Sequence, residues 1–169
     1  MKKIALAAIC AFYLLSAPVF AASPSLIGDY GDWSAYYTQE GKNLVCYMAS
    51  SAQKSEGKYT SRGDVYMVIT HRPADKSFDV VNFVAGYTYK ANAQITVKIG
   101  SNKITDLFAD KDKAWSASDA TDKKLVAEMK KGSQLIIEGS SFKGTQTKDT
   151  YSLKGFSAAY RAISTKCRR

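Results

Sequence analysis

Two cysteines separated by most of the chain place the strongest constraint on how this sequence can fold. Cys46 and Cys167 are the only cysteines once the first 21 residues are set aside, so one intramolecular pairing is available. In an oxidising compartment such a pair is normally joined, and closing a loop of about 120 residues stabilises a fold by roughly 4–5 kcal/mol in the chain-entropy model. A reactive thiol pair is disfavoured because Cys-x-x-Cys spacing is absent. We therefore predict a structural disulfide between Cys46 and Cys167.

The oxidising compartment is inferred from the N-terminal residues, which have the parts of a secretory signal. Lys2 and Lys3 give a positive start, residues 4–15 are mainly apolar, and small residues stand one and three positions before a cleavage point after Ala21. A retained membrane anchor is the alternative, but a spanning helix needs roughly 20 apolar residues. We expect cleavage to leave residues 22–169 as a single domain without a transmembrane segment, and the loss of two lysines lowers the formal charge from +9 to +7.

Apolar residues in this domain recur mainly with the period of β-strands. The predicted strands cover residues 32–38, 44–48, 65–70, 78–84, 94–99, 103–108, 134–138 and 147–153. Residues 50–63 are polar and predict a long turn, and the turn at 100–102 predicts a hairpin between the strands on either side.

Two segments have the pattern of helices. Residues 119–131 follow Ser118 as a candidate N-cap, begin with acidic residues and end in lysines before Gly132, as helix capping and helix-end electrostatics favour. A second, C-terminal helix is predicted by apolar residues at i, i+3, i+4 and i+7, beginning at Phe156 and ending near Cys167. Many short strands with two helical segments predict a β-sandwich covered by helices.

The sequence gives little support for catalytic chemistry. General acid–base catalysis near neutral pH most often uses histidine, and the single histidine, His71, favours a hydrogen-bonded structural role at a strand end. Asp106, Asp110 and Asp112 lack EF-hand spacing and alternate with lysines, which would repel a cation. The glycine-bearing segment 139–144 could cradle an anion, but it lacks a Walker ending and a hairpin connection is favoured. We predict no catalytic, metal or cofactor site.

The positive charge suggests an anionic partner, such as lipid headgroups or an acidic glycan. Export disfavours nucleic acid as the partner, and a merely soluble, lysine-rich surface is the alternative. Tyrosine and tryptophan are favoured at interfaces, although most of the aromatic residues are expected to pack in the core or on the sheets. Our candidate interaction surface consists of Tyr87, Trp115, His71 and Arg72.

Several segments together resemble the invasion-associated locus B family, and the match covers nearly all of the expected mature chain. The matching residues are Trp33, Val45-Cys46-Tyr47, Val68-Ile69-Thr70-His71-Arg72-Pro73, Ala85-Gly86-Tyr87, Ala114-Trp115, Leu125-Val126-Ala127, Met129-Lys130-Lys131-Gly132, Gly144-Thr145-Gln146-Thr147, Asp149-Thr150-Tyr151-Ser152-Leu153-Lys154-Gly155-Phe156, Ala158-Ala159 and Cys167. The resemblance implies an immunoglobulin-like β-sandwich in a periplasmic or outer-envelope protein of Gram-negative bacteria.

This resemblance also carries limits. Some members have a further cysteine after the Gly-Asp-Trp segment, where this chain has residues 34–37 without one, so any second disulfide of those members is absent. Gly86 and Gly155 fit turns or helix entries where a side chain would crowd its neighbours. The family is named for a link to host-cell entry, and no motif that performs this entry can be carried over to particular residues.

Three functional hypotheses follow. The first is a non-enzymatic binding domain of the periplasm or cell surface that holds an unidentified envelope or host component. The second is a structural or chaperone-like periplasmic protein that supports envelope integrity or stress survival. The third, an enzyme, has the least support because no nucleophile–base pair is visible.

Overall fold

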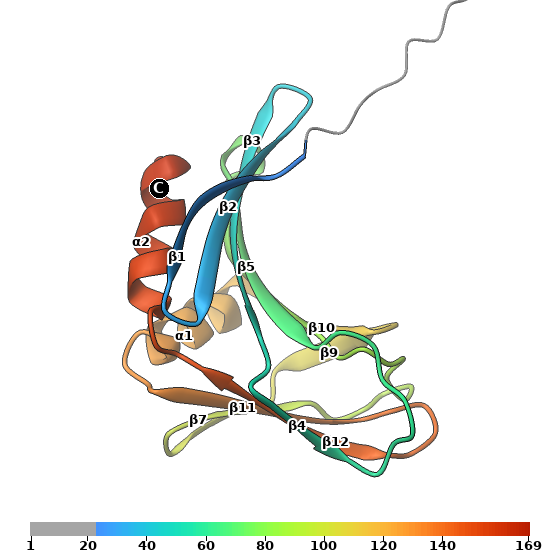
Figure 1. Cartoon of the computed structure of the whole chain (residues 1–169). Coiled ribbons are helices and arrows are strands. Elements are labelled where there is room, and N and C mark those ends of the chain that lie inside the picture. The colour runs from blue at the N-terminus through green and yellow to red at the C-terminus, as the bar shows by residue number, and fades with distance from the viewer. Residues whose placement is uncertain (1–22) are drawn as a thin grey trace, which may run out of the picture.

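A computed structural model describes residues 23–169, which form two antiparallel sheets and two α-helices (Figure 1). The larger sheet has the strand order β1-β2-β3-β5-β6-β10-β9. Its strands are β1 (Ser25–Tyr30), β2 (Trp33–Glu40), β3 (Asn43–Ser51), β5 (Tyr66–Arg72), β6 (Ser77–Val84), β10 (Lys113–Ser116) and β9 (Leu107–Asp110). The predicted signal peptide, residues 1–21, lies outside the described residues.

The smaller sheet has the order β4-β12-β11-β7-β8. Its strands are β4 (Lys54–Gly57), β12 (Gln146–Ser152), β11 (Gln134–Ser140), β7 (Thr96–Ile99) and β8 (Asn102–Ile104). Because β4 pairs with β12 and the chain then returns to the larger sheet as β5, the segment between β4 and β5 connects the two sheets at one end. Figure 1 shows the strands of the two sheets running at a steep angle to each other.

The core is formed where the inward faces of the sheets and the two helices meet. Alternation is clear in β5, where Met67, Ile69 and His71 are buried and the residues between them are partly exposed, as the two-residue period of a strand requires. Met67 and Ile69 belong to one apolar cluster with residues of the smaller sheet, such as Leu135 and Ile137.

Each helix covers one part of this core. Helix α1 (Asp119–Met129) begins at Ser118, whose side chain accepts a hydrogen bond from the Thr121 N–H, and it packs against β6 and β10. Helix α2 (Phe156–Lys166) lies along β1 and β2 (Figure 1). The predicted immunoglobulin-like β-sandwich with a helical insertion and a C-terminal helix is confirmed at the level of two packed antiparallel sheets and these two helices.

Most predicted strands are confirmed, but β1 was not predicted, and the other differences lie in the short strands. The hairpin at residues 100–102 joins β7 to β8, but the strand predicted at 103–108 is divided between β8 and β9. The long turn predicted at 50–63 was wrong in part, because it contains β4. That strand has no apolar alternation and forms through its backbone pairing with β12, so its neighbour and not its own pattern determines its conformation.

Candidate functional site

The predicted disulfide is confirmed. Cys46 on β3 and Cys167 after α2 are bonded, with their Cα atoms 6.0 Å apart and both residues buried. The bond fastens the end of the C-terminal helix to the middle of the larger sheet. This position is that of a structural crosslink, remote from the surface.

The four residues of the predicted interaction surface are not brought together. His71 was wrongly included, because its exposed fraction is 0% and it therefore presents no surface. Arg72 forms two hydrogen bonds to the Glu40 carboxylate, at 2.6 and 3.0 Å, on the larger sheet. Trp115 is partly exposed on β10 beside Phe108 of β9. Tyr87 lies elsewhere, in the wall of a pocket.

The surroundings of His71 explain its burial. Its Nδ1 accepts a hydrogen bond from the Asp79 N–H at 3.1 Å, and its Nε2 lies 3.2 Å from Ser164 Oγ. Because Nδ1 is an acceptor, the neutral ring carries its proton on Nε2, and Nε2–H donates to the Ser164 hydroxyl. A general base would need a free lone pair on the nitrogen that faces the hydroxyl. The hydrogen bond between His71 and Ser164 therefore joins β5 to α2 and does not activate Ser164 as a nucleophile.

The pocket that contains Tyr87 lies between two loops at the end of the smaller sheet. One wall is the segment of residues 58–62 between β4 and β5, and the other is the loop of residues 141–145 between β11 and β12. Its volume is about 330 Å³, within the usual range of small-molecule sites. Three aromatic rings line it, those of Tyr59, Tyr87 and Phe142.

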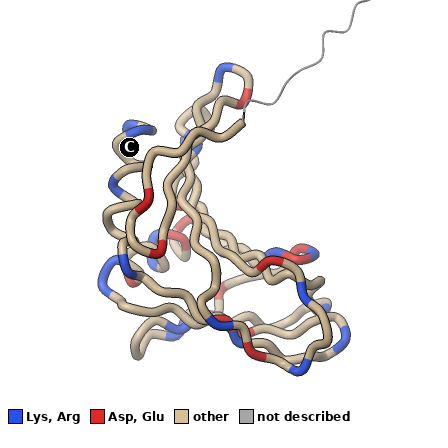
Figure 2. Tube along the Cα trace, viewed as in Figure 1, with Lys and Arg blue, Asp and Glu red and all other residues tan. Residues whose placement is uncertain are grey.

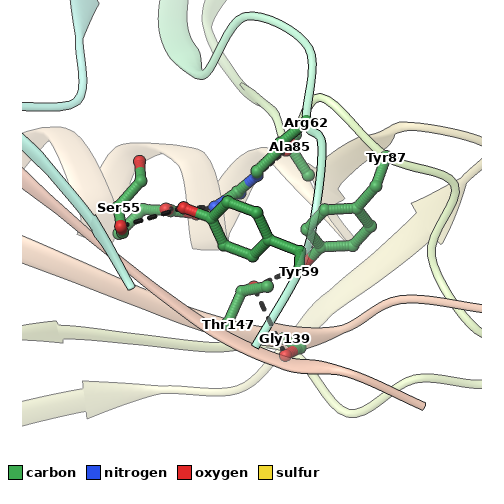
Figure 3. A network of polar contacts seen from close by, with 8 residues as sticks. Ser55, Tyr59, Arg62, Ala85, Tyr87, Gly139 and Thr147 are labelled. Atoms are coloured by element: carbon green, nitrogen blue, oxygen red, sulfur yellow. Dashed lines mark hydrogen bonds and ion pairs between the residues drawn. The ribbon is translucent and has the colours of Figure 1, made fainter. Parts of the chain in front are cut away.

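Arg62 forms the base of the first wall. Its guanidinium donates two hydrogen bonds to the Asp149 carboxylate of β12, at 2.7 and 2.6 Å, and a third to the Ala85 carbonyl at 2.6 Å. The same group lies 5.4 Å from the centre of the Tyr59 ring and 4.8 Å from that of Tyr87, within cation–π range. Figure 3 shows the Arg62 side chain beside these two rings. Burial disfavours the charged guanidinium, but the hydrogen bonds and the charge of Asp149, together with the smaller contributions of Tyr59 and Tyr87, outweigh burial and raise the pKa of Arg62.

The hydroxyl groups of both tyrosines are already engaged. Tyr87 shares a 2.6 Å hydrogen bond with the Thr147 hydroxyl, and Tyr59 donates to the Ser55 carbonyl at 2.9 Å (Figure 3). Burial is the main reason that the pKa of Tyr87 is raised. Gly139 leaves room for the rings over β11, because a Cβ there would lie 2.7 Å from the Tyr89 ring and 3.3 Å from the Tyr87 hydroxyl. The rings are thus held in fixed positions.

The second wall is equally constrained. Within the loop, the Ser141 N–H donates to the Thr145 carbonyl at 2.9 Å, and the Thr145 N–H donates to Ser141 Oγ at 3.2 Å. The Phe142 N–H donates to the Thr88 carbonyl at 2.8 Å, which fixes the loop to the neighbouring connection. Phe142 nevertheless exposes 62% of its surface. The favoured interpretation of 139–144 as a hairpin connection is confirmed.

Positive charge marks the mouth of the pocket. Lys58 and Lys143 are lining residues, and the lining includes no carboxylate. Figure 2 shows basic residues around the loops at this end of the smaller sheet. Sequence reasoning chose Tyr87 as a candidate surface residue and counted Tyr59 only among the many aromatic residues. It missed Arg62 and Asp149, which lie 87 positions apart and therefore produce no local pattern.

Residues 23–169 also bear on metal binding and on membrane spanning. No group of three or more His, Cys, Asp or Glu side chains within this range could hold a metal ion. In the same range, no helix has the length and apolar character needed to cross a membrane.

Comparison with known proteins gives one match. The family model described as "Invasion associated locus B (IalB) protein" matches residues 33–164. Comparison with curated proteins returned no match, and comparison with solved structures returned none either. The matched range extends from the first residue of β2 almost to the end of α2. It thus includes most of both sheets and both helices, and the chain belongs to the invasion associated locus B family.

Proposed function

We propose that this is an exported, non-enzymatic envelope protein that binds an anionic ligand in the pocket between residues 58–62 and 141–145. Family membership supports association with the envelope. The main observation in support of binding is the composition of the pocket lining, which combines aromatic rings in fixed positions with two lysines and contains no carboxylate.

The charge around the pocket favours an anion. Among the described residues, neither Lys58 nor Lys143 has a carboxylate within 4.0 Å. The one carboxylate of the adjacent β4 strand, Glu56, is shared by two other lysines, Lys54 at 2.7 Å and Lys148 at 3.3 Å. The segments 54–62 and 141–149 together carry five cationic and two anionic side chains. Clustered charge of one sign attracts and orients ligands of the other sign.

The aromatic residues favour binding over a purely electrostatic surface. Tyr59 exposes 37% and Phe142 62% of its surface, and both belong to segments fixed by the hydrogen bonds described above. Exposed apolar rings held in this way are typical of interaction sites. Little loop freedom remains to be lost in these segments on binding, so more of the contact energy contributes to affinity.

A paired lysine experiment tests this proposal. The variant Lys58→Gln/Lys143→Gln is compared with wild type and with Lys103→Gln/Lys124→Gln, which removes two exposed lysines without ion pairs elsewhere on the surface. The probes are polygalacturonate, lipopolysaccharide and phosphatidylglycerol vesicles, each at two salt concentrations. We expect the pocket variant to bind at least one probe about tenfold more weakly, since a lysine near an anionic surface contributes about 1 kcal/mol. Equal weakening by both variants would instead mean diffuse attraction to the whole surface.

The compartment forms a further part of the proposal. We place the protein in the periplasm or at the outer surface, and the latter would allow contact with a host cell. Protease digestion of intact cells and of cells with a permeabilised outer membrane separates these locations. Digestion of intact cells supports the surface location and host contact, whereas protection until the membrane is opened supports a periplasmic role.

The second candidate function, a chaperone-like role in envelope maintenance, is favoured by the outward face of the larger sheet. Tyr36 and Tyr47 stack there with ring centres 5.2 Å apart, and Trp115 pairs with Phe108, which is exposed. These two aromatic pairs are separated by β5 and β6, and exposed apolar groups spread over one face suit weak contact with unfolded chains. Suppression of the aggregation of a reduced client, lost in Phe108→Ser but retained in Lys58→Gln/Lys143→Gln, would favour this role.

A further inference from the structure

We propose that the ligand of this pocket is a sugar ring that carries a carboxylate or a phosphate group. This inference rests on the anion-binding function proposed above and specifies the chemistry of the ligand. It comes from three properties of the lining, each of which excludes a different competing class of ligand.

The first property is the apolar ring surface that Tyr59, Tyr87 and Phe142 expose to the pocket. The hydroxyls of Tyr59 and Tyr87 are bonded to Ser55 and Thr147, and Arg62 lies over one face of each ring, so these residues offer a ligand the remaining apolar surface of their rings. Phe142 on the opposite wall offers another face. The C–H groups on one side of a sugar ring pack well against such faces, whereas a free inorganic anion gains nothing from them. A simple phosphate site would need no aromatic lining.

The second property is the set of hydroxyl side chains in the lining. Ser141 is buried and its Oγ already accepts the Thr145 N–H, but Thr60, Ser61 and Thr145 contribute hydroxyls to the wall, and a hydroxyl both donates and accepts hydrogen bonds. Sugar hydroxyls would form hydrogen bonds with these groups. A fatty acyl chain would cover them without replacing their bonds to water, which is unfavourable. The pocket therefore favours a sugar over the apolar part of a lipid.

The third property is the placement of Lys58 and Lys143 on opposite loops. A neutral sugar would leave both ammonium groups without an anionic partner. Arg62 does not take this role, because Asp149 already neutralises its charge and three of its N–H groups donate to Asp149 and to the Ala85 carbonyl. The lysines therefore supply the contacts to an anionic group on the sugar, and Arg62 holds the aromatic wall in place.

Calorimetric titration of the secreted protein with defined probes tests the inference. The probes are trigalacturonic acid, the same trisaccharide with reduced carboxyl groups, glucose 6-phosphate, glucose, inorganic phosphate and phosphatidylglycerol vesicles. We expect an acidic sugar to bind at least tenfold more tightly than its neutral counterpart and than inorganic phosphate. Preference for trigalacturonic acid would assign a carboxylate, and preference for glucose 6-phosphate a phosphate.

Variants connect the binding to the pocket. Phe142→Ala should weaken binding of the acidic sugar at least tenfold, whereas Phe142→Tyr, which keeps the ring, should remain within about threefold of wild type. Thermal unfolding confirms that both variants are folded. Lys103→Gln/Lys124→Gln should bind as wild type does.

The unfavourable outcomes are distinguishable. Vesicles or inorganic phosphate that bind through Lys58 and Lys143 while no sugar binds would overturn the sugar assignment and leave the anion-binding function standing. Binding of neutral and acidic sugars with equal affinity would overturn the role of the lysines and with it both proposals. Absence of binding by every probe would also count against both.

Discussion

Arg62 and Asp149 form a bidentate ion pair whose side chains are only 4% and 5% exposed. The pair joins the segment between β4 and β5 to β12, and it supports the aromatic wall of the pocket through the contacts of Arg62 with Tyr59 and Tyr87. A second bidentate pair, Arg72 with Glu40, has the same chemistry but side chains that are 39% and 52% exposed. The two pairs differ mainly in burial.

Because the two ion pairs differ mainly in burial, the exposed pair serves as a control for the contribution of the buried pair to stability. Arg62→Met should lower the free energy of unfolding by about 3–5 kcal/mol, because it leaves the buried Asp149 carboxylate without its partner. Arg72→Met should cost no more than about 1 kcal/mol, since exposed ion pairs contribute little. The double variant Arg62→Met/Asp149→Leu should cost less than the sum of its single changes. Urea denaturation measures all four, and equal costs for the two arginine variants would contradict this account.

A glycine at the start of α2 provides the second prediction. Gly155 has φ +90°, and a Cβ there would collide with the Tyr30 carbonyl of β1. Gly144 in the pocket loop has a similar φ of +85°, but no atom lies within 4 Å of the corresponding position. Gly144→Ala should therefore cost only the backbone term of about 1–2 kcal/mol.

Gly155→Ala costs the same free energy for the left-handed backbone conformation, and in addition its Cβ would collide with the Tyr30 carbonyl. We expect it to cost more than about 4 kcal/mol or to prevent folding altogether, as measured by urea denaturation and by the yield of folded protein. Similar costs for the two substitutions would mean that the junction between β1 and α2 relaxes easily.

His71 leads to a prediction about pH. Burial is the main reason that the pKa of His71 is lowered from 6.5, and the cations Arg169 and Lys130 act in the same direction while Asp79 opposes them. Ser164 and the rings of Phe78 and Tyr160 complete its surroundings. Below pH 6.5 the unfolded chain therefore binds a proton that the folded chain resists, so stability falls as the pH is lowered through this value.

The sequence makes this effect easy to isolate, because His71 is the only histidine. The free energy of unfolding, measured between pH 7.5 and 5.5, should decrease toward the acidic end in wild type. In His71→Gln, which lacks the titrating ring, the curve should be flatter whatever the overall stability of the variant. An equally steep curve in both proteins would assign the pH dependence to other groups.

The features that the sequence predicted well are those encoded within a few residues. Apolar alternation identified β5, and the Ser118 N-cap with the acidic first turn identified α1. The strands that it missed, such as β1 and β4, have mostly exposed or partly exposed residues. Their conformation depends on pairing with β2 and β12, which no local pattern reveals.

The candidate site was predictable only in part, for the same reason. The positive charge favoured an anionic partner, which stays a prediction, and Tyr87, one of the candidate surface residues, lies partly exposed in the lining of the pocket. Phe142 and Lys143 belong to a loop recognised only as a hairpin connection. His71 at the end of a strand gave no sign of its burial, because α2 and the segment up to Arg169, which cover it, lie about 90 positions later in the chain.

The last prediction concerns the disulfide. Cys46→Ser and Cys167→Ser should destabilise the fold about equally, since either breaks the single bond between β3 and the end of α2, and the chain-entropy model gives about 4–5 kcal/mol for a loop of this size. The double variant should be little worse than either single one, and wild type under reducing conditions should approach the same stability. Urea denaturation with and without reductant measures these differences. A double variant much less stable than both single variants would mean that each cysteine contributes separately, through its own packing in the core, and that the bond itself stabilises the fold less than the loop size predicts.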